Sequence, residues 1–236
     1  MKTVQIPSTS YTLAADWYEG ETTEQIVLVL IAWNSTKAKY QDITEHIVQN
    51  TGMSALVVEY IGFGESQVDV MQVRPAEHFL NVITAFDWLT EQYPTAEISV
   101  MGTSYGGYMA TQLTKYRDFK NLVLRVPAIY VPKDFYALNK NINRHDERTY
   151  RQDVTMLDTH PLFARASSFK GSTLVIVHEL DESIPTETTD KYIQTFQADT
   201  YLAKGFKHSF KLDAPEADKR AYKNAISDWL NNNNER

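Results

Sequence analysis

The chain has 236 residues, of which 43% are hydrophobic and 12% aromatic, and this composition is typical of one folded domain with a sizeable core. It contains no cysteine, which excludes disulfides, thiolate nucleophiles and cysteine-bound zinc. The formal net charge of −7 at pH 7 repels nucleic-acid phosphates and anionic membranes, and no dense cluster of Lys and Arg opposes that repulsion. Since the sequence also shows neither an apolar run of about 18 residues nor a secretory signal, we expect a cytoplasmic protein without nucleic-acid or membrane partners.

Apolar, β-branched runs alternate with helical patterns along most of the chain. The first run, IVLVLIA after Gln25, predicts a strand buried on both faces of a sheet. A helical pattern follows, with capping residues Ser35 and Thr36 at its start and a stop at Asn50 and Gly52.

The same alternation continues toward the C-terminus. Further strands are predicted at SALVVEY, EISVMG, NLVLRV, STLVIVH and TYLA. Helices are predicted from Pro75, from about Tyr105, after Pro185 and over the last residues of the chain. This order predicts right-handed βαβ units, and therefore an α/β fold with a doubly wound, mostly parallel sheet.

Two segments depart from the alternation. The N-terminal stretch VQIPSTSYTLAADWYEG turns at Pro7 and Ser8, which predicts an antiparallel hairpin at the sheet edge. Residues 128–171 lie between two predicted strands and far exceed the usual connection of about 2–6 residues. We interpret them as an insertion within a single domain spanning residues 1–236. The polar middle of this insertion is typical of a solvated helix or loop, and the alternative is a small lid.

The strongest functional motif is GTSYG, in which Gly102, Ser104 and Gly106 match G-x-S-x-G between a predicted strand and a predicted helix. Such a turn strains the residue at its apex, and side chains two positions before and after it would collide. Ser104 would then project its hydroxyl above the sheet edge as a nucleophile. The backbone N–H of Tyr105, at a helix N-terminus, suits an oxyanion. The alternative, a phosphate-binding loop, would have Lys where the chain has Tyr108.

A serine nucleophile needs an adjacent base that is oriented by a carboxylate. His208 follows the last predicted strand, and loops at strand carboxyl ends converge on one edge of a parallel sheet. Asp181 is the first aspartate after the strand STLVIV, and we favour it as the orienting acid. Glu179 and Glu182 beside it, and Asp134 after the preceding strand, remain alternatives.

A metal site would have to use neighbouring residues such as His178, Glu179 and Asp181. Adjacent strand residues point to opposite faces, and no second histidine stands at helical spacing as in H-E-x-x-H. The sequence therefore predicts no metal and no cofactor.

From about Gln25 to Leu230 the chain resembles the α/β-hydrolase superfamily. The resemblance rests on EYIGFGES, GTSYGGYMA, and LVIVHELDESIP with KGFKHSF. The serine turn also looks like that of the acyl-esterase, dienelactone-hydrolase-like and prolyl-oligopeptidase branches. The order Ser104, Asp181, His208 is that of the catalytic triad in this fold.

One stretch departs from the family pattern. After the first long strand the family usually has His-Gly, whose next residue donates the second oxyanion N–H, whereas this chain has Ala32, Trp33 and Asn34. By position, the backbone of Trp33 or Asn34 would supply that donor. Trp33 and Tyr105 are also candidates to line the substrate pocket, and the alternative for Trp33 is packing against the insertion.

Motif and resemblance together predict a serine hydrolase that cleaves a small carboxylic ester or thioester through an acyl-enzyme at Ser104. A serine peptidase or acyltransferase of the same fold is an alternative. A non-catalytic ligand-binding protein on a hydrolase scaffold is another, because fold does not fix function and the AWNST stretch is irregular for the family.

Overall fold

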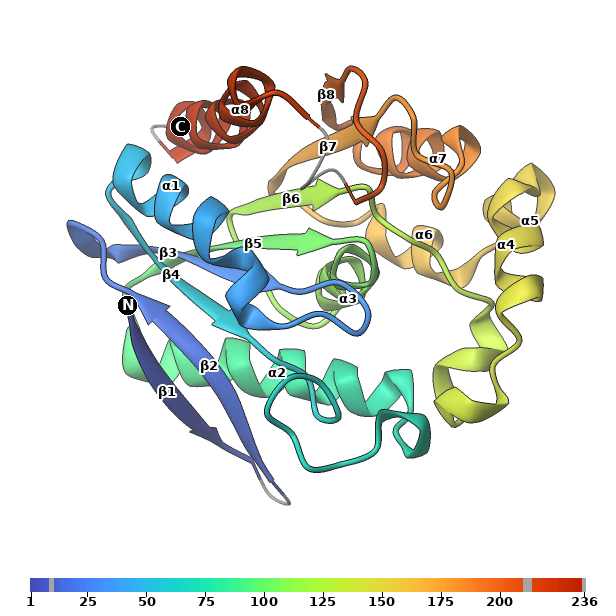
Figure 1. Cartoon of the computed structure of the whole chain (residues 1–236), viewed down its shortest axis with the longest axis horizontal. Helices are drawn as coiled ribbons and strands as arrows, with labels where there is room; N and C mark the ends of the chain where they lie inside the picture. Colours follow the sequence, from blue (N-terminus) through green and yellow to red (C-terminus); the bar gives the residue numbers. More distant parts are fainter. Residues whose placement is uncertain (9–10, 210–213, 235–236) are drawn as a thin grey trace.

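The computed structural model describes residues 1–8, 11–209 and 214–234. Its centre is one eight-stranded sheet in the order β1-β2-β4-β3-β5-β6-β7-β8 (Figure 1). The strands are β1 (Lys2–Pro7), β2 (Thr12–Tyr18), β3 (Thr22–Leu30), β4 (Met53–Val58), β5 (Glu97–Thr103), β6 (Asn121–Arg125), β7 (Ser172–His178) and β8 (Asp199–Ala203). Strands β3 to β8 pair in parallel, while β2 pairs antiparallel with both β1 and β4. The predicted fold class is confirmed, with the N-terminal hairpin at the sheet edge.

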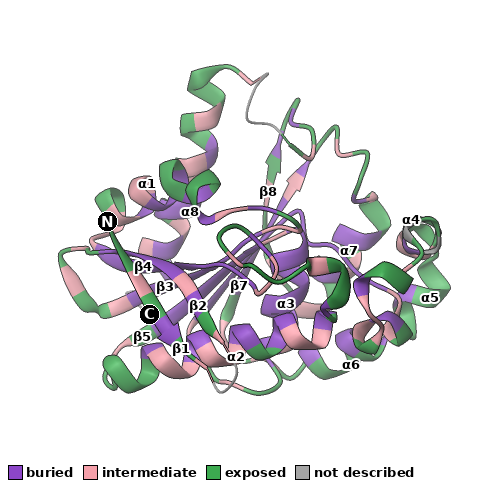
Figure 2. Cartoon of the chain, turned by 60° about the horizontal axis from the view of Figure 1, so that its bottom comes forward, coloured by how far each residue is buried: buried purple, intermediate pink, exposed green. Residues whose placement is uncertain are grey.

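Helices cover both faces of the sheet. The longer ones are α1 (Gln41–Thr51), α2 (Pro75–Gln92), α3 (Tyr105–Leu113), α7 (Thr186–Phe196) and α8 (Glu216–Asn234). Helices α1 and α8 pack together on one face, and α2 and α3 pack together on the other (Figure 1). The strands between them are the most completely buried part of the molecule (Figure 2). Within the described ranges no helix is long and apolar enough to cross a membrane.

The first helix begins later than the sequence pattern indicates. A short 3₁₀ turn, η1 (Lys37–Tyr40), follows Thr36, and the side chain of Thr36 makes no capping hydrogen bond. The backbone N–H of Lys37 instead donates to Glu59 Oε1 at 2.9 Å, so a carboxylate after β4 replaces the expected cap. The helix ends at Gly52, whose φ of 72° is the left-handed conformation that glycine favours.

The insertion folds as a series of short helices between β6 and β7. They are η3 (Pro132–Tyr136), η4 (Asn139–Asn141), α4 (Arg144–Gln152), α5 (Val154–Asp158) and α6 (Pro161–Ala166). Helices α4, α5 and α6 contact α7 beside the sheet (Figure 1).

Helix α4 does not match the expectation of a fully solvated helix, because its polar side chains make packing contacts. Glu147 is 2% exposed. Arg151 Nε donates to the Ile129 carbonyl at 2.9 Å, and its guanidinium lies 4.9 Å from the Tyr130 ring centre. Thr188 Oγ1 of α7 donates to the Arg151 carbonyl at 2.7 Å. Polar groups therefore fix this segment to the loop after β6 and to α7.

Candidate active site

Ser104 lies at the sharp turn between β5 and α3. Its φ of 52° and ψ of −109° are strained for a residue with a side chain. A Cβ atom at Gly102 would collide with the backbone of Gly106, and one at Gly106 would collide with the carbonyl of Leu30 at the end of β3. Glycine is thus required at both positions because backbone from three elements meets at this turn.

Hydrogen bonds from the end of β6 hold the serine backbone. Ser104 N–H donates to the Arg125 carbonyl at 2.8 Å, and Ala128 N–H donates to the Ser104 carbonyl at 3.0 Å. Val126 between them has a φ of 42°, which is rare for a β-branched residue. This second strained turn allows the chain after β6 to form both hydrogen bonds.

The structure brings the three predicted catalytic side chains together. His208 Nε2 lies 3.1 Å from Ser104 Oγ, and His208 Nδ1 lies 2.7 Å from Asp181 Oδ2. The carboxylate can only accept, so Nδ1 carries the imidazole proton and Nε2 can accept the serine proton. The Asp181 side chain is 3% exposed and that of His208 is 25% exposed.

The carboxylate of Asp181 is well satisfied by hydrogen bonds. Oδ1 accepts the backbone N–H groups of Ser183 at 2.8 Å and Ile184 at 2.9 Å, while Oδ2 faces His208. Burial by itself would raise the pKa of Asp181, but the hydrogen bonds and charge of His208 and the two N–H donors outweigh it and lower the pKa. The carboxylate therefore stays ionised while it orients the imidazole.

The alternative acids occupy other positions. Glu179 Oε2 accepts the backbone N–H of Gly205 at 2.8 Å. Glu182 is exposed, and Asp134 lies in η3 of the insertion. Across the described residues, no group of three or more His, Asp and Glu side chains is arranged to hold a metal ion.

The family's usual His-Gly stretch is replaced by a turn at the end of β3. Ser35 N–H donates to the Ala32 carbonyl at 3.2 Å, and Ala32 N–H donates to the Tyr40 hydroxyl at 2.7 Å. Asn34 has a φ of 50°. Asparagine is the side-chain-bearing residue that best tolerates this left-handed conformation, so it serves where glycine would be expected. The turn lies beside Ser104, since Gly106 packs on the adjoining Leu30 carbonyl.

Trp33 stands in an aromatic cluster next to the serine turn. Its ring meets the Tyr105 ring edge-on at 5.2 Å and the Phe63 ring edge-on at 5.3 Å. Trp33 is half-buried, whereas Tyr105 is only 1% exposed. The prediction that the Tyr105 side chain lines the pocket is therefore wrong, because its ring supports Trp33 from the protein interior. Trp33 retains surface that a substrate could touch.

Sequence reasoning missed two polar residues on the buried face of α2, His78 and Asn81. Both are fully buried, and both bind the backbone of Ile61 in the loop after β4. The signal in the sequence was a histidine and an asparagine three positions apart within an otherwise apolar helix face.

A second missed group lies beneath the His208 loop. His178 Nδ1 lies 2.8 Å from the carbonyl of Lys207, and its Nε2 lies 3.2 Å from the Tyr222 hydroxyl. Arg125 Nε donates to the same hydroxyl at 2.8 Å. Burial, aided by the nearby Arg125 charge, lowers the pKa of His178 to about 4, so the ring is neutral and donates from Nδ1 to the Lys207 carbonyl.

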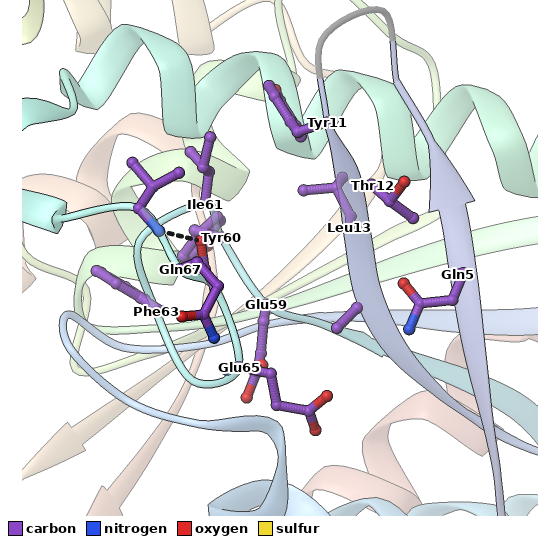
Figure 3. A pocket seen from close by; sticks show the side chains of 13 residues that line it. Gln5, Tyr11, Thr12, Leu13, Glu59, Tyr60, Ile61, Phe63, Glu65 and Gln67 are labelled. Atoms are coloured by element: carbon purple, nitrogen blue, oxygen red, sulfur yellow. Dashed lines mark hydrogen bonds between the residues drawn. The ribbon is translucent and has the colours of Figure 1, made fainter.

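A cavity of about 300 Å³ lies between the β1–β2 hairpin and the loop after β4. Figure 3 shows the side chains that line it. The residues that line it are Gln5, Tyr11, Thr12, Leu13, Ala14, Glu59, Tyr60, Ile61, Phe63, Glu65, Ser66, Gln67 and Val68. None of the three side chains that meet at Ser104 is among them. This cavity is thus separate from the candidate active site, although both use the loop that carries Phe63.

A strained serine between a parallel strand and a helix, with a histidine and an aspartate aligned behind it, defines the class of α/β serine hydrolases. The family model described as serine aminopeptidase, S33, matches residues 21–162, which is more than half of the chain. The chain belongs to this family of α/β hydrolases, so the resemblance seen in the sequence is confirmed at the level of the superfamily. No curated protein matches it significantly.

Solved structures with the same fold cover nearly all of the chain. Est1E from Butyrivibrio proteoclasticus, with ferulic acid bound, has a TM-score of 0.74 at 13% identity over 99% of this chain and 100% of its own. A monoacylglycerol lipase from Paleococcus ferrophilus has a TM-score of 0.72 at 16% identity, covering 94% of this chain and 99% of its own. An alpha-beta serine hydrolase homologue from Coxiella burnetii has a TM-score of 0.71 at 12% identity, with 97% of both chains covered.

Proposed function

We propose that this protein hydrolyses a small carboxylic ester or thioester through an acyl-enzyme on Ser104. The observation that carries the proposal is the continuous contact from Ser104 Oγ through His208 to Asp181, at 3.1 and 2.7 Å. These are hydrogen-bond distances for proton transfer, and the buried carboxylate fixes the required tautomer.

In the proposed mechanism, His208 Nε2 removes the hydroxyl proton as Ser104 Oγ forms a bond to the carbonyl carbon. The carbonyl electron pair moves onto oxygen, and the N–H of Tyr105 with that of Trp33 or Asn34 stabilises this oxyanion. When the tetrahedral intermediate collapses, the bond to the leaving group breaks and His208 donates its proton to that group. Water, deprotonated by His208, then forms a bond to the acyl carbon. As the second tetrahedral intermediate collapses, the bond from the acyl carbon to Ser104 Oγ breaks, the acid leaves, and His208 returns the proton to Oγ. No cofactor takes part in these steps.

The size and class of substrate are inferred from the surroundings of the serine. Trp33 takes the place of a small residue beside the proposed oxyanion hole, and its ring is fixed against Tyr105 and Phe63. A bulky residue there favours a compact acyl group. Two structural neighbours support an ester substrate: one is a monoacylglycerol lipase, and Est1E binds ferulic acid, a carboxylic acid of the kind that ester hydrolysis releases.

A peptidase is the second candidate, because the matching family model is named for serine aminopeptidases. The two activities share the acyl-enzyme and differ in the leaving group. Parallel assays with p-nitrophenyl esters and with aminoacyl p-nitroanilides distinguish them: preferred turnover of the anilides would replace the esterase proposal with a peptidase.

The direct test is labelling with a fluorophosphonate, which reacts preferentially with activated serine nucleophiles. We expect one adduct on the wild-type protein, located at Ser104 by peptide mass spectrometry, and none on Ser104→Ala. Ser168→Ala is the matched control, because the exposed Ser168 hydroxyl donates to the nearby Arg165 carbonyl at 3.0 Å and none of the described residues links it to Ser104. A folded wild-type protein that takes up no label would favour a non-catalytic binding protein.

A further inference from the structure

His78 lies on the buried face of α2, and both of its ring nitrogens have partners. Nε2 is 2.9 Å from the carbonyl of Ile61, and Nδ1 is 2.7 Å from the hydroxyl of Tyr105. Because a carbonyl can only accept, Nε2 carries the proton and Nδ1 accepts from the tyrosine. Burial lowers the pKa of His78 to about 4, so this neutral tautomer persists at ordinary pH.

Asn81, one turn further along α2, completes the hold on the same loop residue. Its Oδ1 accepts the backbone N–H of Ile61 at 2.8 Å, and its side-chain amide donates to the Tyr11 hydroxyl. Both backbone hydrogen-bonding groups of Ile61 are thus bound by side chains of α2. The loop after β4 is thereby fixed relative to the helix.

The fixed loop in turn supports the residues beside Ser104. Phe63 of this loop contacts the Trp33 ring edge-on at 5.3 Å, and Trp33 contacts the Tyr105 ring edge-on at 5.2 Å. His78 itself lies 5.0 Å from the Phe63 ring centre. The side chains of Tyr105 and Trp33 therefore belong to one cluster organised around His78, and the backbone at the same two residues is where the oxyanion donors are proposed.

We propose that His78 is a positioning residue for the oxyanion hole. It holds Tyr105 directly through the hydroxyl, and it holds Trp33 through Ile61 and Phe63. This inference rests on the proposed function and extends it to a residue in a different helix. An apolar side chain would fill the same space without desolvating an imidazole, but it could not fix the direction of the tyrosine hydroxyl.

A matched pair of substitutions in α3 isolates this contact. Tyr105→Phe removes only the hydroxyl that bonds to His78. Tyr108→Phe removes a hydroxyl from the same helix one turn later, where the ring is also 1% exposed and the hydroxyl accepts from Gln112 at 3.1 Å. Both variants lose one buried hydroxyl, so a purely structural role would affect them alike.

The rate of Ser104 phosphonylation by a fluorophosphonate is the primary measurement, with kcat and KM for p-nitrophenyl acetate beside it. In Tyr105→Phe the donor is displaced rather than removed, so we expect phosphonylation and kcat to fall about tenfold with KM unchanged. Tyr108→Phe should stay within about twofold of wild type. Equal rates in the two variants, or a loss confined to KM, would overturn the inference.

A double-mutant cycle connects the effect to His78. Because both substitutions remove the bond between His78 and Tyr105, the loss in the double variant should be smaller than the product of the two single losses. What His78→Phe adds beyond Tyr105→Phe reports its separate hold on Ile61. Full additivity of the two losses would show that His78 does not act through Tyr105. If His78→Phe does not fold, the comparison of Tyr105→Phe with Tyr108→Phe still decides the inference. Failure of the proposed function gives a different result, since wild-type Ser104 would then remain unlabelled.

Discussion

Two buried histidines brace the two sides of Ser104 in the same way. His78 on α2 and His178 at the end of β7 each join a loop carbonyl to a buried tyrosine hydroxyl. Burial lowers the pKa of both to about 4, so both are neutral structural donors and acceptors. They differ in what they hold: His78 binds beside the proposed oxyanion donors, whereas His178 binds the residue that precedes His208.

The two regions also differ in how completely the side chains beside Ser104 are buried. On the His78 side, Asn81 fixes the same loop residue a second time, and the Tyr105 ring is 1% exposed. On the His178 side, the carbonyls of Phe206 and Lys207 are both held by hydrogen bonds, but the His208 side chain that this loop carries is 25% exposed. This contrast fits the chemistry, because oxyanion donors must not move whereas the imidazole must serve both the serine and the leaving group.

Removal of the imidazole on the more exposed side should have the largest effect. We expect His208→Ala to lower kcat by about a million-fold, since the serine then has no base. His145→Ala, an exposed histidine of α4, is the control and should leave ester turnover unchanged. Retention of most activity in His208→Ala would show that another group acts as the base.

The next largest effect is expected at the acid. Asp181→Asn preserves shape but favours the wrong imidazole tautomer, and we expect kcat to fall about ten-thousand-fold. Glu179→Gln should have little effect on turnover, because that carboxylate binds Gly205 instead of His208. A comparable loss in both variants would reopen the choice of acid.

Asp181 also makes stability depend on pH. Its pKa is lowered below the ordinary value of 3.8, so its ionised form stabilises the fold above that pH, and this contribution is lost as pH falls through the folded pKa. The stability advantage of the wild type over Asp181→Asn, measured by urea unfolding, should therefore shrink below pH 3.8. An advantage independent of pH would contradict the lowered pKa.

Tyr222→Phe tests the brace on the more exposed side. Loss of the hydroxyl leaves His178 Nε2 and Arg125 Nε without this partner, so we expect a stability loss of about 1–3 kcal/mol. The fall in kcat should be smaller than in Tyr105→Phe, because the His208 loop retains the bond between His178 and Lys207. A larger fall in Tyr222→Phe would reverse the comparison between the two sides.

The smallest effect is expected at Asn34, whose φ is 50°. Asn34→Gly should keep turnover and change the free energy of unfolding by less than about 1 kcal/mol, because glycine accepts this conformation freely. Asn34→Val should cost more stability and activity, since a β-branched residue is strained there. Equal behaviour of the two variants, by thermal unfolding and ester turnover, would show that the turn relaxes easily.

Local patterns made the sheet and the serine turn predictable. Buried strands such as β3 and the glycines around Ser104 are recognisable because their constraints act between residues close in the sequence. The order of strands and helices then placed Asp181 and His208 at the correct edge of the sheet. The choice between Asp181 and its acidic neighbours needed the structure, which assigns Glu179 to Gly205.

The braces could not be predicted because their partners are distant in the sequence. The contact between His78 and Tyr105 depends on how α2 packs against α3, and that between His178 and Tyr222 depends on how α8 covers the sheet. For the same reason the prediction that the Tyr105 side chain lines the substrate pocket is wrong. Its position next to the nucleophile indicates where its backbone lies, whereas the direction of its ring is set by His78 and Trp33.

The central claim, an acyl-enzyme on Ser104, is tested most directly by intact-protein mass spectrometry after rapid acid quench with p-nitrophenyl acetate. We expect the Asp181→Asn and wild-type proteins to gain one acetyl group that maps to Ser104, and Ser104→Ala to gain none. Turnover of the ester with no adduct at Ser104, or with an adduct that persists in Ser104→Ala, would contradict the account.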